Sequence, residues 1–101
     1  MESLSPEGRI AHVEVIYEGD HSLPSVYMAE VVEKAVKIFG PRLRWEKVEL
    51  MKKRGVQRFA ELSVRNGGVA AIPSLFVNGK LAFEAVPSLK ALEDYLLEVL
   101  K

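Results

Sequence analysis

An Asn-Gly pair between two short apolar runs is the feature that most constrains this chain of 101 residues. Asn78 and Gly79 both tolerate positive φ angles, which the two central positions of a type I′ turn require. The runs on either side, residues 74–77 and 80–83, are apolar and long enough to form strands. The chain is therefore predicted to contain a β-hairpin over residues 74–83, and its fold must include an antiparallel strand pair.

A long helix is expected directly after Ser22. Serine is a favoured N-cap, and Pro24 falls in the first turn, where its missing N–H costs little. Apolar residues then recur at helical spacing. Gly40, which is followed by a proline, ends the pattern because glycine accepts the left-handed conformation of a helix C-terminus.

Four charged residues of this helix are expected to pair with one another. Glu30 precedes Lys34 by four residues, and Glu33 precedes Lys37 by the same spacing. Residues four apart are neighbours on a helix surface, and an acidic residue before a basic one is the favourable order. Two ion pairs on the exposed face are therefore predicted.

Two more strands and two more helices are expected. Residues 11–17 and 43–50 predict strands, the second at a sheet edge because charges interrupt its alternation. Residues 51–55 are expected to form a loop before a short helix, and Ser88 to cap a last helix. The buried face of the short helix is assigned to Val56, Phe59, Ala60, Ser63 and Val64.

The order β-α-β-α-β-β-α predicts an α/β fold, with a four-stranded mixed sheet in a three-layer arrangement. The first β-α-β unit implies parallel strands, and the hairpin adds antiparallel ones. Hydrophobic residues make up 49% of the chain, and its length suits one domain, assigned to residues 11–101 after a lead-in over residues 1–10. No apolar run approaches the ~20 residues that span a membrane, and no signal-like segment opens the chain. We therefore expect a cytoplasmic protein without membrane contacts.

Charge is balanced overall, with 14 basic and 14 acidic residues, but it is unevenly distributed. Basic residues crowd the segment from Lys37 to Arg58, where only Glu46 and Glu49 oppose them. They are Lys37, Arg42, Arg44, Lys47, Lys52, Lys53, Arg54 and Arg58. A solvated surface is the expected interpretation, and a docking patch for an acidic partner or RNA is the alternative. Nucleic acid is disfavoured because aromatic residues are not interleaved with the basic ones.

Cysteine is absent from the chain. Its absence excludes a disulfide, a thiolate metal site and a cysteine nucleophile in this sequence. His12 and Glu14 alternate onto one strand face, but two such residues without a further cluster are more typical of a satisfied pair beneath a helix than of a metal site. No metal or other cofactor is expected.

Two segments of the chain resemble the thioredoxin-like superfamily, which includes thioredoxins and glutaredoxins. Ser22-Leu23-Pro24-Ser25 stands where that family carries its Cys-x-x-Cys redox motif, and a proline at the third position is frequent there. Ala71-Ile72-Pro73-Ser74, followed by an apolar strand and Asn-Gly, resembles the family's cis-proline and the strand after it. The resemblance covers roughly residues 11–100 and implies a thioredoxin-like fold.

The resemblance also implies what positions 22 and 25 would do. The family's first cysteine is the attacking thiolate, and a helix N-terminus lowers its pKa through partial positive charge and unpaired N–H groups. The second cysteine, one turn further on, resolves the mixed disulfide. Ser22 and Ser25 occupy these catalytic positions. Because a serine hydroxyl neither ionises readily nor forms a disulfide, this chain is expected to be redox-inactive.

Two explanations for the serines stay open. They can be engineered replacements in a thiol–disulfide oxidoreductase that acts on protein disulfides. We favour this explanation because both redox positions hold serine and no cysteine remains elsewhere. Alternatively, the natural protein lost its cysteines and kept the groove as a non-catalytic binding module.

The residues that would bind a substrate are implied by the same resemblance. The Ile72–Pro73 bond is expected to be cis and to lie near Ser22, so that the backbone of residue 72 can pair with an extended peptide. Protein thiols or disulfides are the expected partners. Pro24 and His21 are assigned to the same groove. A histidine beside a nucleophile can tune its pKa, and the alternative is a loop histidine in solvent.

A glutathione-binding, transferase-like domain is a further alternative. The N-terminal domains of glutathione transferases share the fold and the proline, and some use a serine at the first helix. That family holds the glutamyl end of glutathione with a Glu-Ser or Gln-Ser pair after the hairpin. This chain has Glu84-Ala85 there, so half of the pair is missing.

Overall fold

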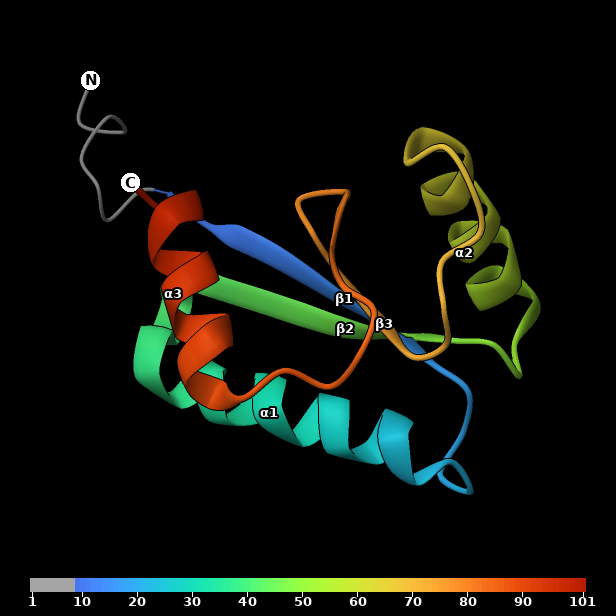
Figure 1. Ribbon diagram of the computed structural model, residues 1–101, viewed down its shortest axis with the longest axis horizontal. Helices are drawn as coiled ribbons and strands as arrows, with labels where there is room; N and C mark the ends of the chain where they lie inside the picture. Colours follow the sequence, from blue (N-terminus) through green and yellow to red (C-terminus); the bar gives the residue numbers. More distant parts are fainter. Residues whose placement is uncertain (1–8) are drawn as a thin grey trace.

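Figure 1 shows the computed structural model of the protein, which describes residues 9–101. The chain forms a mixed α/β structure, so the expected class is confirmed. In chain order the elements are β1 (Ala11–Tyr17), α1 (Leu23–Phe39), β2 (Leu43–Glu49), α2 (Lys53–Arg65), β3 (Ser74–Val77), β4 (Lys80–Phe83) and α3 (Leu89–Val99). The lead-in expected over residues 1–10 lies mostly outside the described residues.

The four strands form one open mixed sheet in the order β2-β1-β3-β4. β1 pairs with β2 in parallel, whereas the β1–β3 and β3–β4 pairs are antiparallel. β1 and β3 are therefore central, and β2 and β4 are the two edges. The prediction of an edge strand over residues 43–50 is confirmed for β2.

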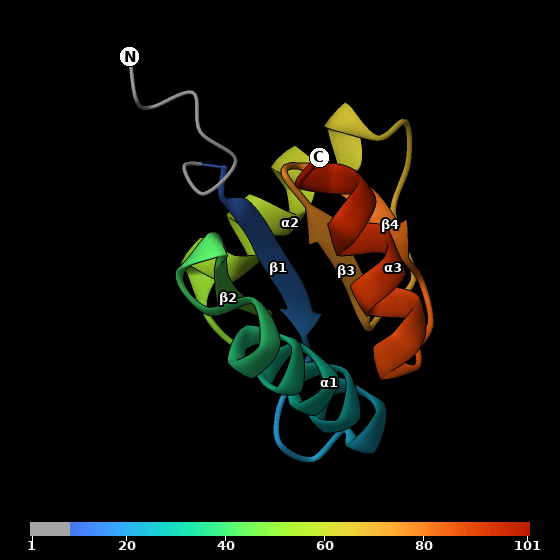
Figure 2. The ribbon, with the colours of Figure 1, turned by 90° about the vertical axis from the view of Figure 1, so that its left-hand side faces the viewer.

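Helices cover both faces of this sheet (Figures 1 and 2). α1 and α3 pack on one face, where Val13 and Val15 of β1 join the larger apolar cluster. α2 packs on the other face, against Ile16 and Phe76. Because both faces are covered, β1 and β3 are nearly continuous runs of buried residues rather than alternating ones.

The hairpin between β3 and β4 has the expected turn. Asn78 has φ of 52° and Gly79 has φ of 82°, so both central residues adopt the positive φ of a type I′ turn. The turn is also tied to β1. The Asn78 N–H donates to the His12 carbonyl at 2.8 Å, and the Asn78 side-chain oxygen accepts from the His12 N–H at 2.9 Å. The strongest local signal in the sequence therefore also anchors the start of the central strand.

Helix α2 begins earlier than expected. The predicted loop over residues 51–55 is wrong for its last three residues, because Lys53 to Gly55 already form the first turn of α2. Lys52 is the N-cap and makes no side-chain capping bond, so the usual capping signal is missing from the sequence. Gly55 is buried, and a Cβ there would collide with the Glu49 backbone. The close approach of two backbones, rather than a cap, fixes this helix start.

The buried face assigned to α2 is also wrong in part. Val56 and Val64 are 51% and 82% exposed, and Ala60 is exposed as well. The buried positions are Gly55, Leu62 and Ser63, with Phe59 partly buried against the same cluster. The face of α2 turned toward the sheet also includes Arg58, which hydrogen-bonds a buried carboxylate of the sheet.

That carboxylate is Glu14 in the middle of β1, which is 2% exposed. Arg58 of α2 donates to both of its oxygens, at 2.6 and 2.9 Å. The hydrogen bond to Glu14 also raises the pKa of Arg58 further above its ordinary value. Glu14 is therefore satisfied beneath a helix, but the expected pair with His12 is wrong, because Arg58 is its partner and His12 lies 3.0 Å from Glu46. Arg58 does not belong to a solvated surface, in contrast to the expectation for the basic segment.

Asn66, which follows α2, links that helix to the hairpin. Its side-chain nitrogen donates to the Leu62 carbonyl at 2.8 Å and to the Gly79 carbonyl at 3.0 Å. Its side-chain oxygen accepts from the Leu81 N–H at 3.0 Å. One side chain thus satisfies the end of α2 and two backbone groups at the outer side of the hairpin.

The remaining basic residues before and within the start of α2 are exposed, as expected. Lys52 forms a surface ion pair with Glu49 at 3.2 Å, and such pairs contribute little to stability. We expect replacement of Lys52, Lys53 and Arg54 by glutamine to change the free energy of unfolding by less than about 0.5 kcal/mol in urea titrations. A loss of several kcal/mol would contradict a solvated surface. Salt-sensitive binding of RNA by the unmodified chain would favour the docking patch instead.

Candidate functional site

Ser22 sits at the start of α1, where the sequence places it. Its backbone is extended, with φ of −99° and ψ of 105°, and its hydroxyl accepts from the Ser25 N–H at 3.4 Å. The N-cap is therefore confirmed. Pro24 lies in the first turn and has no N–H to offer, so the N–H of Ser25 is the donor that a side chain at position 22 can reach.

Ser25 lies one turn further along α1 and is fully buried. Its hydroxyl accepts from the Glu18 N–H at 3.1 Å, just after β1 ends. This hydrogen bond joins the first turn of α1 to the C-terminal end of a central strand. Ser22 and Ser25 thus form one unit, with a half-buried hydroxyl at the helix start and a buried one behind it.

The loop between β1 and α1 is held by Tyr17 at the end of the strand. The Tyr17 hydroxyl donates to Asp20, and this hydrogen bond, followed by burial, raises the pKa of Tyr17 to about 12. The Lys47 ammonium lies 4.3 Å from the centre of the Tyr17 ring. The Ser22 N–H donates to the Gly19 carbonyl at 3.0 Å, which closes the loop. The position of Ser22 is therefore fixed from both sides.

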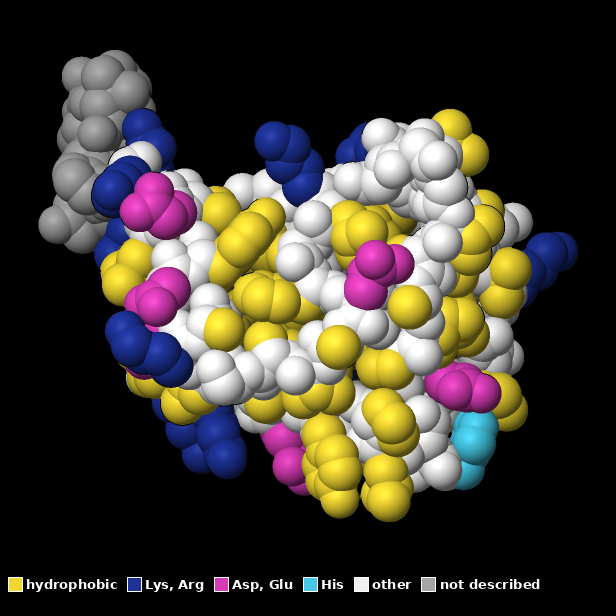
Figure 3. All heavy atoms as spheres, viewed as in Figure 1, with side chains coloured by type: hydrophobic (Ala, Val, Ile, Leu, Met, Phe, Trp, Pro, Cys, Tyr) yellow, Lys and Arg dark blue, Asp and Glu magenta, His cyan; other side chains and the backbone are white. Residues whose placement is uncertain are grey.

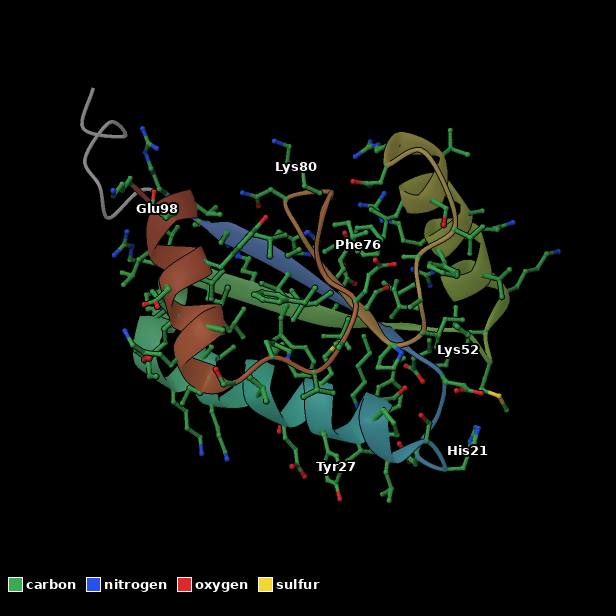
Figure 4. All side chains as sticks on the ribbon, viewed as in Figure 1. His21, Tyr27, Lys52, Phe76, Lys80 and Glu98 are labelled. Atoms are coloured by element: carbon green, nitrogen blue, oxygen red, sulfur yellow. The ribbon has the colours of Figure 1, made fainter. Side chains whose placement is uncertain are left out.

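His21 does not point toward Ser22 in this arrangement. Its side chain is 64% exposed, and its Nε2 lies 3.8 Å from the Glu18 carboxylate. The ring also packs over Gly19, where a Cβ would collide with it. Figure 4 shows His21 on the loop between β1 and α1, at the outer edge of the molecule. The geometry matches the loop histidine in solvent better than a group that tunes position 22.

The segment before β3 reaches the same end of the sheet. The Ile72–Pro73 bond is cis, as predicted; Pro73 is buried and Ile72 is 45% exposed. Ser74 pairs with Ile16, so Pro73 follows in register opposite Tyr17. Tyr17 directly precedes the loop whose Glu18 N–H donates to Ser25. The Glu84 carboxylate accepts from the Ala71 N–H at 3.0 Å and ties this segment to the end of the hairpin.

Exposed apolar side chains surround the start of α1. Leu23 and Tyr27 are 59% and 51% exposed and lie four residues apart on one helix face. Figure 3 shows hydrophobic side chains along the lower edge of the molecule, over α1 and beside the histidine. Figure 4 places Tyr27 on this edge. An apolar surface next to helix-start N–H groups can receive an extended polypeptide.

Three residues that the sequence did not single out hold this site together. Tyr17 and Asp20 brace the loop, and Glu84 braces the segment before Pro73. In the sequence, Tyr17 is only the last residue of a predicted strand, and Glu84 is only a candidate glutathione contact. The sequence shows only that these polar residues lie at the ends of loops, and such a position does not reveal which group each residue binds.

Of the helices in residues 9–101, none is both long and apolar enough to cross a membrane. In the same part of the chain, no three His, Asp or Glu side chains gather in a way that could hold a metal ion. Neither a model of a known protein family nor a curated protein matches this sequence.

Proposed function

We propose that this domain is a thioredoxin-like scaffold whose natural form exchanges thiols and disulfides with protein substrates. In the chain as it stands, serine occupies both redox positions, so it binds such substrates without turning them over. The observation that carries the proposal is the unit at the start of α1. The Ser22 hydroxyl accepts from the Ser25 N–H, which is the place where a thiolate at position 22 would be stabilised.

The surroundings of this unit support the proposal. Sheet order β2-β1-β3-β4 and helices on both faces are compatible with a thioredoxin-like fold. The helix dipole and the free N–H groups of the first turn favour a negative charge at position 22 rather than at 25, which is fully buried. Two sulfur atoms at these positions would therefore differ in pKa and in access, as an attacking and a resolving thiol must.

The chemistry of such a pair balances within the protein and its substrate. A thiolate at position 22 attacks one sulfur of a substrate disulfide, and the other substrate sulfur leaves as a thiolate that takes up a proton. The thiol at position 25 then loses its proton and attacks the sulfur at position 22. An intramolecular disulfide forms, the second substrate thiol leaves, and the substrate has gained two electrons from the protein.

A natural binding module is the second candidate, and one observation favours it. Leu23 and Tyr27 on α1 and Ile72 before the cis-proline expose apolar side chains, which suits recognition of a peptide with or without redox chemistry. Glutathione binding is less well supported. The Glu84 carboxylate already accepts from the Ala71 N–H, and Ala85 offers no hydroxyl.

The double substitution Ser22→Cys and Ser25→Cys tests the proposal. We expect this variant to form a reversible intramolecular disulfide under mild oxidant, because residues one helical turn apart bring their sulfurs within bonding reach. It should reduce a protein disulfide such as that of insulin, whereas the unmodified chain should not. Mass spectrometry measures the disulfide, and turbidity follows insulin reduction.

The two single variants are the matched controls. Ser22→Cys alone should react with iodoacetamide near neutral pH and trap mixed disulfides, since no resolving thiol is present. Ser25→Cys alone should react far more slowly because the side chain is buried. If the double variant forms no intramolecular disulfide although circular dichroism shows an intact fold, the oxidoreductase proposal fails and the binding module becomes the better account.

A further inference from the structure

Strand β2 ends the sheet with a row of backbone groups that no other described strand pairs with. Directly after β2, the Leu50 N–H donates to the Tyr17 carbonyl of β1 at 2.9 Å. Backbone groups alternate between the two sides of a strand, so the even-numbered residues of β2 direct their amides toward β1. The N–H and C=O groups of Trp45 and Lys47 and the C=O group of Leu43 therefore point outward along the free edge, whereas the Leu43 N–H donates to the Gly40 carbonyl.

Two exposed charges of β2 flank Trp45 and have opposite signs. Arg44 precedes Trp45 and Glu46 follows it, both are exposed, and both lie on the sheet face covered by α2. If two β2 strands pair in antiparallel fashion about Trp45, Arg44 of each copy lies opposite Glu46 of the other. Opposite charges directly across a strand pair are stabilising, and the two-fold symmetry forms the pair twice. In the same register Leu43 lies opposite Lys47, so the Lys47 N–H can donate to the Leu43 carbonyl of the other copy.

Four charges on α1 have the same kind of symmetry. Glu30, Glu33, Lys34 and Lys37 are all exposed, and their spacing places them on one stripe of the helix. The prediction of ion pairs between them is wrong: in the described part of the chain, no salt bridge joins any two of these four residues. When two copies of the helix lie side by side in antiparallel fashion, each acidic residue of one stripe faces a basic residue of the other. Glu30 then meets Lys37, and Glu33 meets Lys34.

Both patterns share one centre. Trp45 and the four charges of α1 line the same hollow of about 420 Å³, so the middle of the stripe lies beside Trp45. α1 contacts both β1 and β2 and connects these parallel strands, so it runs opposite to β2. With α1 lying over β1 and β2, the strand spacing of about 4.8 Å would place the α1 axes of two edge-paired copies roughly 10–14 Å apart. Extended Glu and Lys side chains can bridge that separation.

We propose that the free edge of β2 is a homodimer interface, and that its occupant is a second copy of this chain. The two copies pair in antiparallel fashion about a two-fold axis that passes Trp45 and the midpoint between Glu33 and Lys34. A continuous eight-stranded sheet results, with ion pairs between the β2 strands on one face and between the α1 helices on the other. A two-fold contact of this kind is the commonest form of oligomer symmetry.

Sedimentation equilibrium of the full chain over a range of concentrations tests the proposal. The fluorescence of Trp45, the only tryptophan in the sequence, provides a second signal from the centre of the interface. Glu33→Lys should raise the dimer dissociation constant by about tenfold or more, because it opposes like charges at two symmetry-related places. Adding Lys34→Glu reverses both signs and should restore the original dissociation constant.

Lys80→Glu is the matched control, since Lys80 is an exposed lysine on the opposite edge strand, β4. It should leave the dissociation constant unchanged. A chain that stays monomeric up to its solubility limit overturns the proposal. A dimer that ignores Glu33→Lys, or is weakened by it and not restored by Lys34→Glu, uses a different surface and overturns it too.

Discussion

Arg58→Ala is expected to lower the free energy of unfolding by about 3–5 kcal/mol, the usual cost of removing one partner from a buried ion pair. The substitution leaves the Glu14 carboxylate 2% exposed in the middle of β1 with neither of its two donors. Water entering through the hollow of about 390 Å³ that both residues line replaces these charged donors only in part. Urea unfolding followed by circular dichroism measures the loss.

Two further variants separate the pair from its surroundings. Arg54→Ala, on an exposed residue in the first turn of the same helix, should change stability by less than about 0.5 kcal/mol. Replacing both Glu14 and Arg58 by leucine removes the charges together and should recover most of the loss. A single Arg58→Ala variant as stable as the original chain would show that Glu14 does not depend on Arg58.

Gly55→Ala is expected to cost about 3 kcal/mol or more, although alanine is the better helix former. A Cβ at this position would collide with the carbonyl oxygen of Glu49, which is backbone and cannot rotate away. The first turn of α2 would have to separate from the end of β2. The midpoint of urea unfolding reports the effect, and crystallography of the variant would reveal any shift of the turn.

Gly68→Ala is the natural comparison. A Cβ at Gly68 would meet nothing within 4 Å, so its effect should stay within about 0.5 kcal/mol. If the two alanine variants were equally stable, steric contact with Glu49 would not be the reason for glycine at position 55.

Local chemistry explains which parts of the fold could be predicted. Ser22 and Ser88 cap helices by accepting from N–H groups three residues on, and Asn78-Gly79 forms the turn that its backbone preferences favour. These signals act within a few residues, so a sequence displays them directly. α2 lacked such a signal, because Lys52 makes no capping bond and its start depends on Glu49.

Long-range pairing explains what the sequence did not show. Arg58 and Glu14 are 44 residues apart, and nothing near either residue marks the other as its partner. The candidate site likewise has a part that local sequence predicts and a part that only the folded chain shows. Positions 22 and 25 follow from the motif, whereas the hydrogen bond from Glu18 to Ser25 and the one from Ala71 to Glu84 follow from how the chain closes in space.

The two edges of the sheet are not equivalent, and the difference sets a limit on stoichiometry. The Asn66 side chain pairs with the Gly79 carbonyl of the turn and with the Leu81 N–H of β4, while the outward groups of Trp45 and Lys47 on β2 pair with no other described strand. A sheet with two open edges can add copies without end and grow into a fibre. Because the Leu81 N–H of β4 is already paired within its own chain, strand addition is favoured at β2, and a two-fold pair through β2 would be closed. Asn66, in addition to ending a helix, thus reduces the number of backbone groups that this edge offers to another chain.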